Sequence, residues 1–240
     1  MNRVLFSRLM VATALISLPI FAKHTAAVQP SHGIKNFITC ASEYHEPINI
    51  DVIKKQIKEF RTSGQWDKGI TCVVDQAYAQ LKKYMPVRNK KLAVIADIDD
   101  TSLSNYEFIV SNDFGYDHDR TKKWEMKGLD PAIAQVRDLC NFAKKNGFAL
   151  FFITGRREDE RQATERNLKN AGFKDWDKAY FKPMDFKGSS AVEFKQVWRE
   201  HIMSQGYTLI LNFGDQLTDF EGKAQAQYNF KIPNPMYIIR

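Results

Sequence analysis

The sequence of 240 residues is poor in cysteine and histidine, and it lacks repeats. Three cysteines allow at most one disulfide with one thiol left over. The histidines do not show the spacing of a metal-binding motif, so we expect His32, His45 and His118 in loops or on the surface. There is no internal repeat and no low-complexity segment. The content of 44% hydrophobic and 26% charged residues excludes a disordered or collagen-like chain.

Long runs of one kind of residue are also missing. The net charge is +7, but its Lys and Arg residues are spread along the chain without a long basic run. We interpret this charge as favouring solubility and anionic substrates, and we expect no nucleic-acid polymer as a partner. The one extended apolar run, from about Leu9 to Ala22, is shorter than the ~20 residues that a membrane span needs. The sequence therefore predicts no stable membrane anchor.

The apolar run has the surroundings of a secretory signal. Arg3 and Arg8 precede it, and the small residues 25–27 follow it. The order of basic, apolar and small residues is typical of a signal peptide, predicted here as residues 1–27. Cleavage after residue 22 and cleavage after residue 27 both fit. A buried core helix is the alternative interpretation. We expect an exported protein, periplasmic or secreted.

The three cysteines are expected to differ in their surroundings. Cys140 lies in a strongly helical, apolar stretch and is predicted to be a buried thiol. Cys40 and Cys72 both lie in the N-terminal region and are the plausible disulfide pair in an oxidising compartment. Whether they pair is left open by the sequence.

The pattern of apolar residues changes near Lys91. Residues 28–90 are predicted to be an N-terminal extension with two helices between about Ile50 and Met85, broken at Ser63-Gly64. From Lys91 onward, short apolar runs alternate with helical segments. The expected strands are 92–96, 148–153, 179–181, 207–213 and an edge strand at 230–232; the expected helices are 131–146 (with Asp130 as its cap), 158–171 and 189–205.

This alternation indicates an α/β fold. Continuous apolar strands between helices favour a Rossmann-like parallel sheet with helices on both faces. The core is predicted to span residues 91–240. Residues 102–129, which show neither a strand pattern nor a clear helical one, are interpreted as a small cap insertion. Sheets of this kind bind ligands at the carboxyl ends of their strands.

Polar residues whose side chains could take part in catalysis lie at those strand ends. Asp97 and Asp99 follow the first strand, Thr154-Gly155 ends the second, and Asp215 and Asp219 follow the strand at 207–213. Lys195 lies on the helix before that last strand, and Lys182 and Lys187 are nearby alternatives for its role.

Such a set suits phosphoryl transfer. Asp97 could attack phosphorus, while Asp99 could protonate the leaving alkoxide and then activate water. Mg²⁺ prefers hard oxygen ligands and could lie between the phosphate and the carboxylates Asp97 and Asp215. Asp219 could hold a metal-bound water. Thr154 and Lys195 could neutralise the phosphoryl oxygens.

The ordered motifs resemble those of a known superfamily. The Asp-Ile-Asp-Asp-Thr run 97–101 resembles the DxDxT motif of the haloacid dehalogenase (HAD) superfamily, residues 153–156 resemble its second motif, and residues 214–219 its GDxxxD motif. The flanking residues of the first two motifs resemble the class B/class C group of secreted bacterial and plant acid phosphatases. The resemblance covers roughly residues 91–219.

By this resemblance the protein is an Mg²⁺-dependent phosphatase that forms a phospho-aspartate. It implies that Asp97 is both nucleophile and metal ligand, and that Asp99 is the acid/base and binds the metal through its carbonyl. It also implies that Thr154, Gly155 and Lys195 contact phosphate, and that Asp215 binds the metal, with Asp219 as a further candidate.

Several alternatives remain open at this level. Tyr106 and Trp124 could stack on the leaving group of the substrate or could simply cover the core. The expected substrates are small phosphomonoesters, which the sequence does not name. Phosphotransfer to an alcohol would use the same residues, and a non-catalytic binding or storage protein is a further alternative that the presence of Asp97 and Asp99 disfavours. Dehalogenation has no use for Asp99 or a metal.

Overall fold

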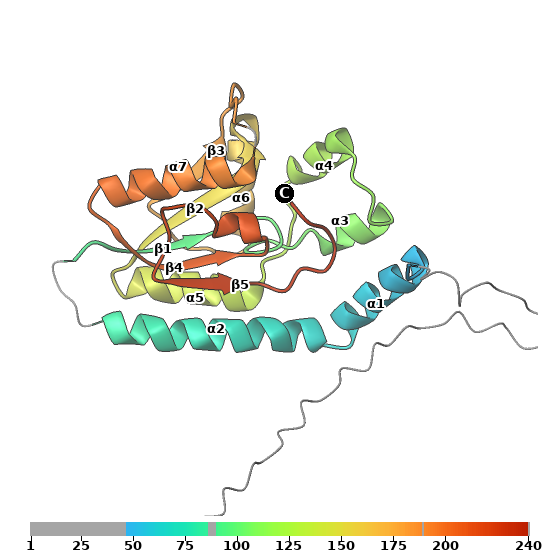
Figure 1. Ribbon diagram of the computed structural model, residues 1–240, viewed down its shortest axis with the longest axis horizontal. Coiled ribbons are helices and arrows are strands. Elements are labelled where there is room, and N and C mark those ends of the chain that lie inside the picture. Colours follow the sequence, from blue (N-terminus) through green and yellow to red (C-terminus); the bar gives the residue numbers. More distant parts are fainter. Residues whose placement is uncertain (1–46, 86–89, 189, 240) are drawn as a thin grey trace, which may run out of the picture. The chain divides into compact units, whose positions relative to one another are not determined.

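Figure 1 shows the computed structural model, which describes residues 47–85, 90–188 and 190–239. The chain divides into two units, Met1–Val52 and Ile53–Arg240. The sheet and the candidate site belong entirely to the second unit. The predicted signal peptide 1–27 and Cys40 lie outside the described residues, so both the signal peptide and the disulfide with Cys72 stay predictions.

Two helices precede the sheet, as predicted. Helix α1 spans Ile50–Thr62 and α2 spans Gln65–Tyr84. The break falls at Gly64, whose φ of 76° is in the left-handed region that glycine adopts without a steric penalty. One face of α2 is buried, and its side chains reach the main core cluster.

Five strands form one sheet in which every neighbouring pair is parallel. They are β1 (Leu92–Ala96), β2 (Ala149–Arg157), β3 (Lys178–Lys182), β4 (Thr208–Gly214) and β5 (Tyr228–Lys231). Their order across the sheet is β3-β2-β1-β4-β5. The predicted α/β fold with a parallel sheet is therefore confirmed, including the edge strand near the C-terminus.

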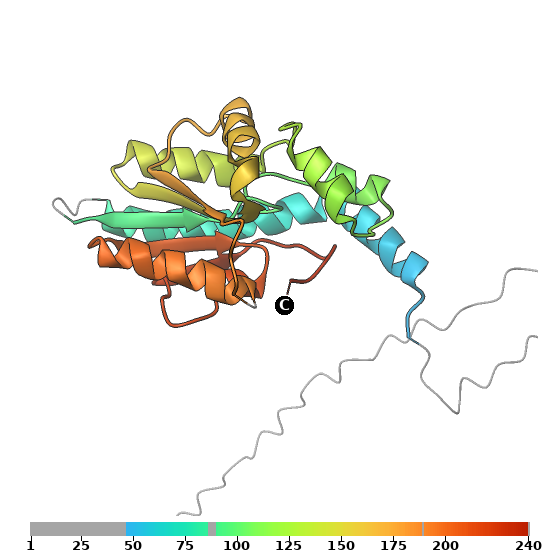
Figure 2. The same ribbon diagram turned by 90° about the horizontal axis from the view of Figure 1, so that it is seen from above.

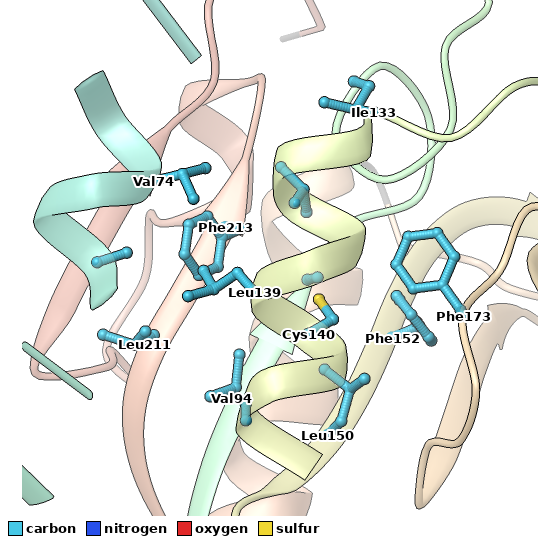
Figure 3. Packing of buried hydrophobic residues seen from close by; sticks show 14 of the residues in the cluster. Val74, Val94, Ile133, Leu139, Cys140, Leu150, Phe152, Phe173, Leu211 and Phe213 are labelled. Atoms are coloured by element: carbon cyan, nitrogen blue, oxygen red, sulfur yellow. The ribbon is translucent and has the colours of Figure 1, made fainter. Parts of the chain in front are cut away.

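Helices cover both faces of this sheet, as expected. The longer ones that follow β1 are α5 (Ala134–Lys145), α6 (Arg161–Asn170) and α7 (Ala191–Ser204). Helices α2 and α5 pack on one face and α7 on the other (Figure 1). Figure 3 shows Leu139 and the thiol of Cys140 on α5 pointing toward strand residues such as Leu150 and Phe213. Cys140 is fully buried, as predicted.

The segment 102–129 differs from its prediction because it contains two short helices. Helix α3 spans Tyr106–Ser111 and α4 spans His118–Glu125. The Asp117 carboxylate caps α4 by accepting the Arg120 N–H at 2.8 Å. Both helices lie beyond the end of the sheet toward which the strand arrows point (Figures 1 and 2).

Asp130 does not cap the helix after it, contrary to the prediction. Helix α5 begins only at Ala134, because residues 131–133 pair with the loop after β1: the Ser104 N–H donates to Pro131 O and the Ile133 N–H to Ser102 O, each at 2.9 Å. The Asp130 carboxylate therefore does not cap α5 and is available to bond residues of the candidate site.

The direction in which the chain crosses the sheet reverses next to β1. From β1 the chain continues to β2 and β3 on one side, and it then returns to form β4 and β5 on the other side of β1. Ligands of parallel α/β sheets bind at the carboxyl ends of such strands. Among the described residues, none of the helices has both the length and the apolar character needed to cross a membrane.

Candidate active site

Three buried carboxylates meet where β1 and β4 end. Asp97 directly follows β1, and its N–H donates to Phe213 O of β4 at 2.9 Å. Asp215 and Asp219 follow β4. One carboxylate oxygen from each of the three aspartates lies within 4.8 Å of the others, and each residue is at most 6% exposed. Oxygen donors grouped in this way suit a hard divalent cation.

Gly214 allows the third carboxylate to reach this cluster. A Cβ atom at Gly214 would lie 2.1 Å from Asp219 Oδ2 and 2.4 Å from Asp219 Cβ. No side chain fits there, so the return of Asp219 against the end of β4 requires glycine. The Gln216 N–H then donates to Asp219 Oδ2 at 2.9 Å and fixes the short turn.

Lys195 supplies the positive charge of the cluster. It projects from α7, and its Nζ donates to Asp97 Oδ1 at 2.7 Å and to Asp219 Oδ1. The residue is 7% exposed. Of the alternatives, Lys182 lies over the Phe186 ring and Lys187 is exposed. Among the three lysines considered, Lys195 is the one that contacts the carboxylates.

The charges of this cluster do not balance. Burial raises the pKa of Asp97 well above its usual range, although the Lys195 ammonium opposes this. Burial and the neighbouring Asp219 also raise the pKa of Asp215. Three carboxylates face one ammonium, so two negative charges are left uncompensated when all are ionised. A divalent cation supplies the missing charge, and the residues present therefore fit such an ion.

The Asp99 carboxylate is bound by an arginine fork. Arg156 Nε donates to Asp99 Oδ1 and Oδ2 at 3.1 and 3.2 Å, and Nη2 donates to Oδ1 at 2.7 Å. Asn105 Nδ2 adds a donor at 2.7 Å. Burial alone would raise the pKa of Asp99, but the Arg156 guanidinium outweighs it and lowers that pKa.

Arg156 is itself held by a buried network. Its Nη2 donates to Asp130 Oδ2 at 3.0 Å and its Nη1 to Thr164 Oγ1 at 3.2 Å. The side-chain amide of Asn167 bonds both the N–H and the C=O of Asp130, at 2.8 and 2.7 Å. The indole N–H of Trp124 donates to the other Asp130 oxygen. The arginine is therefore fixed before any ligand arrives.

Thr154 and Gly155 lie at the end of β2, next to β1. Ala96 of β1 pairs with Phe152 of β2. Asp97 follows Ala96 by one residue and Thr154 follows Phe152 by two, so both lie at the same edge of the sheet. Thr154 is fully buried and its Oγ1 accepts the Arg156 N–H at 3.1 Å. Gly155 is exposed, and a Cβ there would have no heavy atom within 4 Å. Open space is thus present at the strand end.

The loop after Asp97 is folded tightly on itself. Ser102 Oγ donates to Asp97 O at 2.6 Å, and the Leu103 N–H donates to Ile98 O at 2.8 Å. Asp100 has a φ of 50° in the left-handed region, and burial raises its pKa to about 8. Thr101 Oγ1 donates to Asp215 Oδ1 at 3.2 Å, which links this loop to the end of β4.

Tyr106 and Trp124 lie in different surroundings. Trp124 on α4 stacks on Phe108 with ring centroids 5.4 Å apart, and its N–H reaches the Arg156 network through Asp130. The Tyr106 ring lies 5.0 Å from the Arg61 guanidinium. Both are partly exposed, so a substrate contact stays a prediction for each.

The structure brings further residues to the site that have no role in the sequence prediction. Arg156 could have been found, because it directly follows Thr154-Gly155 at a strand end. The sequence predicts Asp130 as a helix cap, whereas its carboxylate accepts a hydrogen bond from Arg156. Asn234 and Tyr237, which contact Asp215 and Asp100, carry no recognisable signal because they lie beyond the last strand.

Comparison with known proteins shows which family the chain resembles. Acid phosphatase 1 of Solanum lycopersicum is 33% identical over 186 residues, covering 76% of this chain and 73% of that protein. The Stem 28 kDa glycoprotein of Glycine max is 31% identical over 217 residues, 85% of each chain. The solved class C acid phosphatase from Bacillus anthracis shares the fold, with a TM-score of 0.63 and 21% identity over 78% of this chain and 86% of that chain.

The family model described as HAD superfamily, subfamily IIIB (Acid phosphatase), matches residues 24–240. The match includes the ends of β1, β2 and β4 together with α7, and therefore every residue of the cluster described above. The chain belongs to the acid phosphatase family that forms subfamily IIIB of the HAD superfamily.

Proposed function

We propose that the protein is an exported, Mg²⁺-dependent acid phosphatase that hydrolyses small phosphomonoesters through a phospho-aspartate. The observation that carries this proposal is the cluster of Asp97, Asp215 and Asp219 with Lys195 at the ends of β1 and β4. An oxygen nucleophile, a counter-charge and a place for a cation are the parts that phosphoryl transfer needs.

In the first step Asp97 acts as nucleophile. One of its carboxylate oxygens attacks phosphorus, and the bond from phosphorus to the ester oxygen breaks. Asp99, in its protonated form, gives its proton to the leaving alkoxide, so that an alcohol departs. Lys195 and Thr154 bind the phosphoryl oxygens, and the open space at Gly155 admits the substrate.

In the second step the phospho-aspartate is hydrolysed. Asp99, now ionised, takes a proton from a water molecule whose oxygen attacks phosphorus. The bond between phosphorus and the Asp97 oxygen breaks, which releases inorganic phosphate and restores the Asp97 carboxylate. Arg156 keeps the Asp99 carboxylate oriented throughout, because its fork binds both oxygens.

The metal would be held by Asp97 and Asp215, with the Asp99 carbonyl as a further ligand and Asp219 beside it. When bound, Mg²⁺ neutralises charge on the phosphate and the carboxylates. The export proposal rests on the sequence of residues 1–27.

The decisive experiment measures hydrolysis of an aryl phosphate with Mg²⁺ and with EDTA, for the wild type and for Asp97→Asn. We expect EDTA to abolish activity, Mg²⁺ to restore it, and Asp97→Asn to lower kcat by ~10³-fold or more, because no nucleophile remains. Asp119→Asn is the matched control, since its side chain is 85% exposed. Activity that survives both EDTA and Asp97→Asn would overturn the mechanism.

The same assay separates the alternatives. If an added alcohol acceptor captures the phosphoryl group in place of water, phosphorylated alcohol appears and the inorganic phosphate falls below the released phenol. For hydrolysis we expect equal amounts of inorganic phosphate and released phenol. A storage protein without activity would give no phenol from the wild type at all.

A further inference from the structure

The C-terminal segment, residues 233–239, returns to the candidate site after the last strand. Strand β5 ends at Lys231, and the Ile232 N–H still donates to Gly214 O at 2.7 Å. The chain then leaves the sheet and curves back, as the red trace in Figure 1 shows. Two of its side chains bond aspartates of the catalytic loops.

Asn234 holds one oxygen of Asp215. Its Nδ2 donates to Asp215 Oδ2 at 2.6 Å, and Gln216 Nε2 donates to the same oxygen at 2.6 Å. Oδ1 accepts only the weaker Thr101 hydroxyl bond at 3.2 Å among the described residues. Two amide donors on Oδ2 therefore prevent the buried carboxylate from rotating.

Gln216 ties this contact to the rest of the segment. Its Oε1 accepts the Ile239 N–H at 2.9 Å, and its Nε2 lies 3.5 Å from Tyr237 O. The amide of Gln216 thus binds the C-terminal segment and Asp215 together, and it is itself buried.

Tyr237 holds the loop after β1 from the other side. Its hydroxyl donates to Asp100 Oδ2 at 2.9 Å, while Asp100 Oδ1 accepts the Asn105 N–H at 2.9 Å. Asp100 has the left-handed φ of 50°, which costs free energy in a residue with a side chain. The two hydrogen bonds stabilise that conformation, and Asp100 lies directly after Asp99 in the chain.

We propose that Asn234 and Tyr237 are positioning residues: the C-terminal segment holds Asp215 and the Asp100 turn in the geometry that binds the metal. The inference rests on the proposed metal-dependent function. Partners that orient ligand carboxylates contribute to metal affinity, and their loss lowers it by ~10–100-fold. Asn234 bonds one proposed metal ligand, Asp215, directly. Tyr237 bonds Asp100, which lies in the loop that carries the proposed ligands Asp97 and Asp99.

The test compares Asn234→Leu and Tyr237→Phe with the wild type and with Ile238→Ala. Leucine matches asparagine in size but has no donor, and phenylalanine lacks only the hydroxyl. Ile238 belongs to the same segment and is 70% exposed, so it controls for general disturbance. Mg²⁺ binding without substrate is measured by calorimetry, together with the thermal midpoint of the metal-free proteins and the Mg²⁺ dependence of aryl phosphate hydrolysis.

We expect Asn234→Leu to weaken Mg²⁺ binding by about tenfold or more. Raised Mg²⁺ should restore its kcat, and the substrate KM at saturating Mg²⁺ should be unchanged. Tyr237→Phe should weaken binding less, and Ile238→Ala not at all. Wild-type affinity in both Asn234→Leu and Tyr237→Phe would overturn the inference, as would an equal loss in Ile238→Ala.

The same measurements distinguish failure of the proposed function from failure of this inference. A wild type that binds no Mg²⁺ and is indifferent to EDTA refutes the metal-dependent function, and the inference falls with it. A wild type that binds Mg²⁺ while its variants bind it equally well refutes the inference alone. If Asn234→Leu does not fold, Tyr237→Phe decides the outcome, because removing one hydroxyl leaves the packing of the ring intact.

Discussion

The guanidinium of Arg156 contacts both carboxylate oxygens of Asp99, with Nη2 at 2.7 Å from Oδ1 and Nε at 3.2 Å from Oδ2. This fork fixes the orientation of Asp99 and lowers its pKa against the effect of burial. In the proposed mechanism Asp99 must carry a proton to release the alcohol. A lowered pKa confines that protonated form to acidic solution, so the proposed mechanism predicts activity at low pH.

Arg156→Lys should therefore change both the rate and its pH dependence. Lysine keeps a charge but cannot bind both oxygens, so we expect kcat to fall by about 10–100-fold. The weaker interaction lets the pKa of Asp99 rise, so the pH above which kcat declines should move upward by about one unit. A pH profile of kcat with an aryl phosphate measures both effects. Arg120→Lys, at an exposed position, serves as the control. An unshifted profile in Arg156→Lys would contradict the assigned role of Asp99.

Lys195→Met should destabilise the metal-free protein because it leaves buried carboxylates without a counter-charge. Removing one partner of a buried ion pair costs about 3–5 kcal/mol. The pKa of Lys195 is raised, so the ammonium is charged throughout the neutral range and its stabilising effect would be lost only in strongly alkaline solution. The loss in the variant should shrink as the pH falls, because burial raises the pKa of Asp97 and the carboxylate can then take up a proton.

Urea unfolding at pH 5 and pH 8 with EDTA measures this effect. Lys187→Met is the matched control, since Lys187 is exposed. Equal unfolding free energies for the two variants at pH 8 would refute the account. In the assay with Mg²⁺ we also expect Lys195→Met to lose at least ~100-fold in kcat, because the phosphoryl charge is then unpaired.

Much of this arrangement follows from local sequence signals. Apolar runs of strand length, separated by helices, predicted all five strands of the sheet, including the one that ends at Lys231. Because the carboxyl ends of parallel strands share one edge, the residues after β1 and β4 were expected at the same edge of the sheet. That β1 and β4 are neighbours, which brings Asp97 and Asp215 together, is a result of the strand order in the structure.

Contacts that depend on the path of irregular chain could not be predicted. Asp130 before Pro131 has the pattern of a helix cap, yet it binds Arg156, because residues 131–133 pair with the loop after β1. Nothing in the residues after Ile232 indicates that Tyr237 returns to Asp100. Periodicity describes regular elements, whereas these contacts are set by the tertiary course of loops.

Glu125→Gln should stabilise the protein in alkaline but not in acidic solution. Glu125 ends α4, and its Oε1 lies 3.8 Å from Arg156 Nε. Burial, the neighbouring Asp99 and Glu160 raise its pKa to about 10, despite the opposing guanidinium. Between about pH 4.5 and pH 10 the unfolded chain has lost a proton that the folded protein keeps, so stability falls as pH rises through this window.

Glutamine at position 125 does not ionise, so the folded variant has no carboxyl proton to retain in this pH range. We expect Glu125→Gln to gain ~1–3 kcal/mol of unfolding free energy at pH 8 and nothing at pH 4. Urea unfolding at the two pH values measures the difference. Glu107→Gln, at an exposed position on α3, is the matched control. A gain that is the same at both pH values would mean that packing, and not ionisation, is responsible.

Arg199→Met should lower stability although Arg199 contacts no carboxylate among the described residues. The side chain is 1% exposed; Nε donates to Ala224 O and Nη1 to Asp219 O, each at 2.6 Å, and Nη2 donates to Glu221 O. Methionine leaves these buried carbonyls with fewer donors, at a cost of about 3–5 kcal/mol and a drop of roughly 6–20 °C in Tm. Because the same carbonyls belong to the turn that carries Asp219, kcat should fall at temperatures where the variant is still folded. Calorimetry with the exposed Arg166→Met as control measures the drop, and an unchanged Tm in Arg199→Met would show that water replaces the guanidinium without cost.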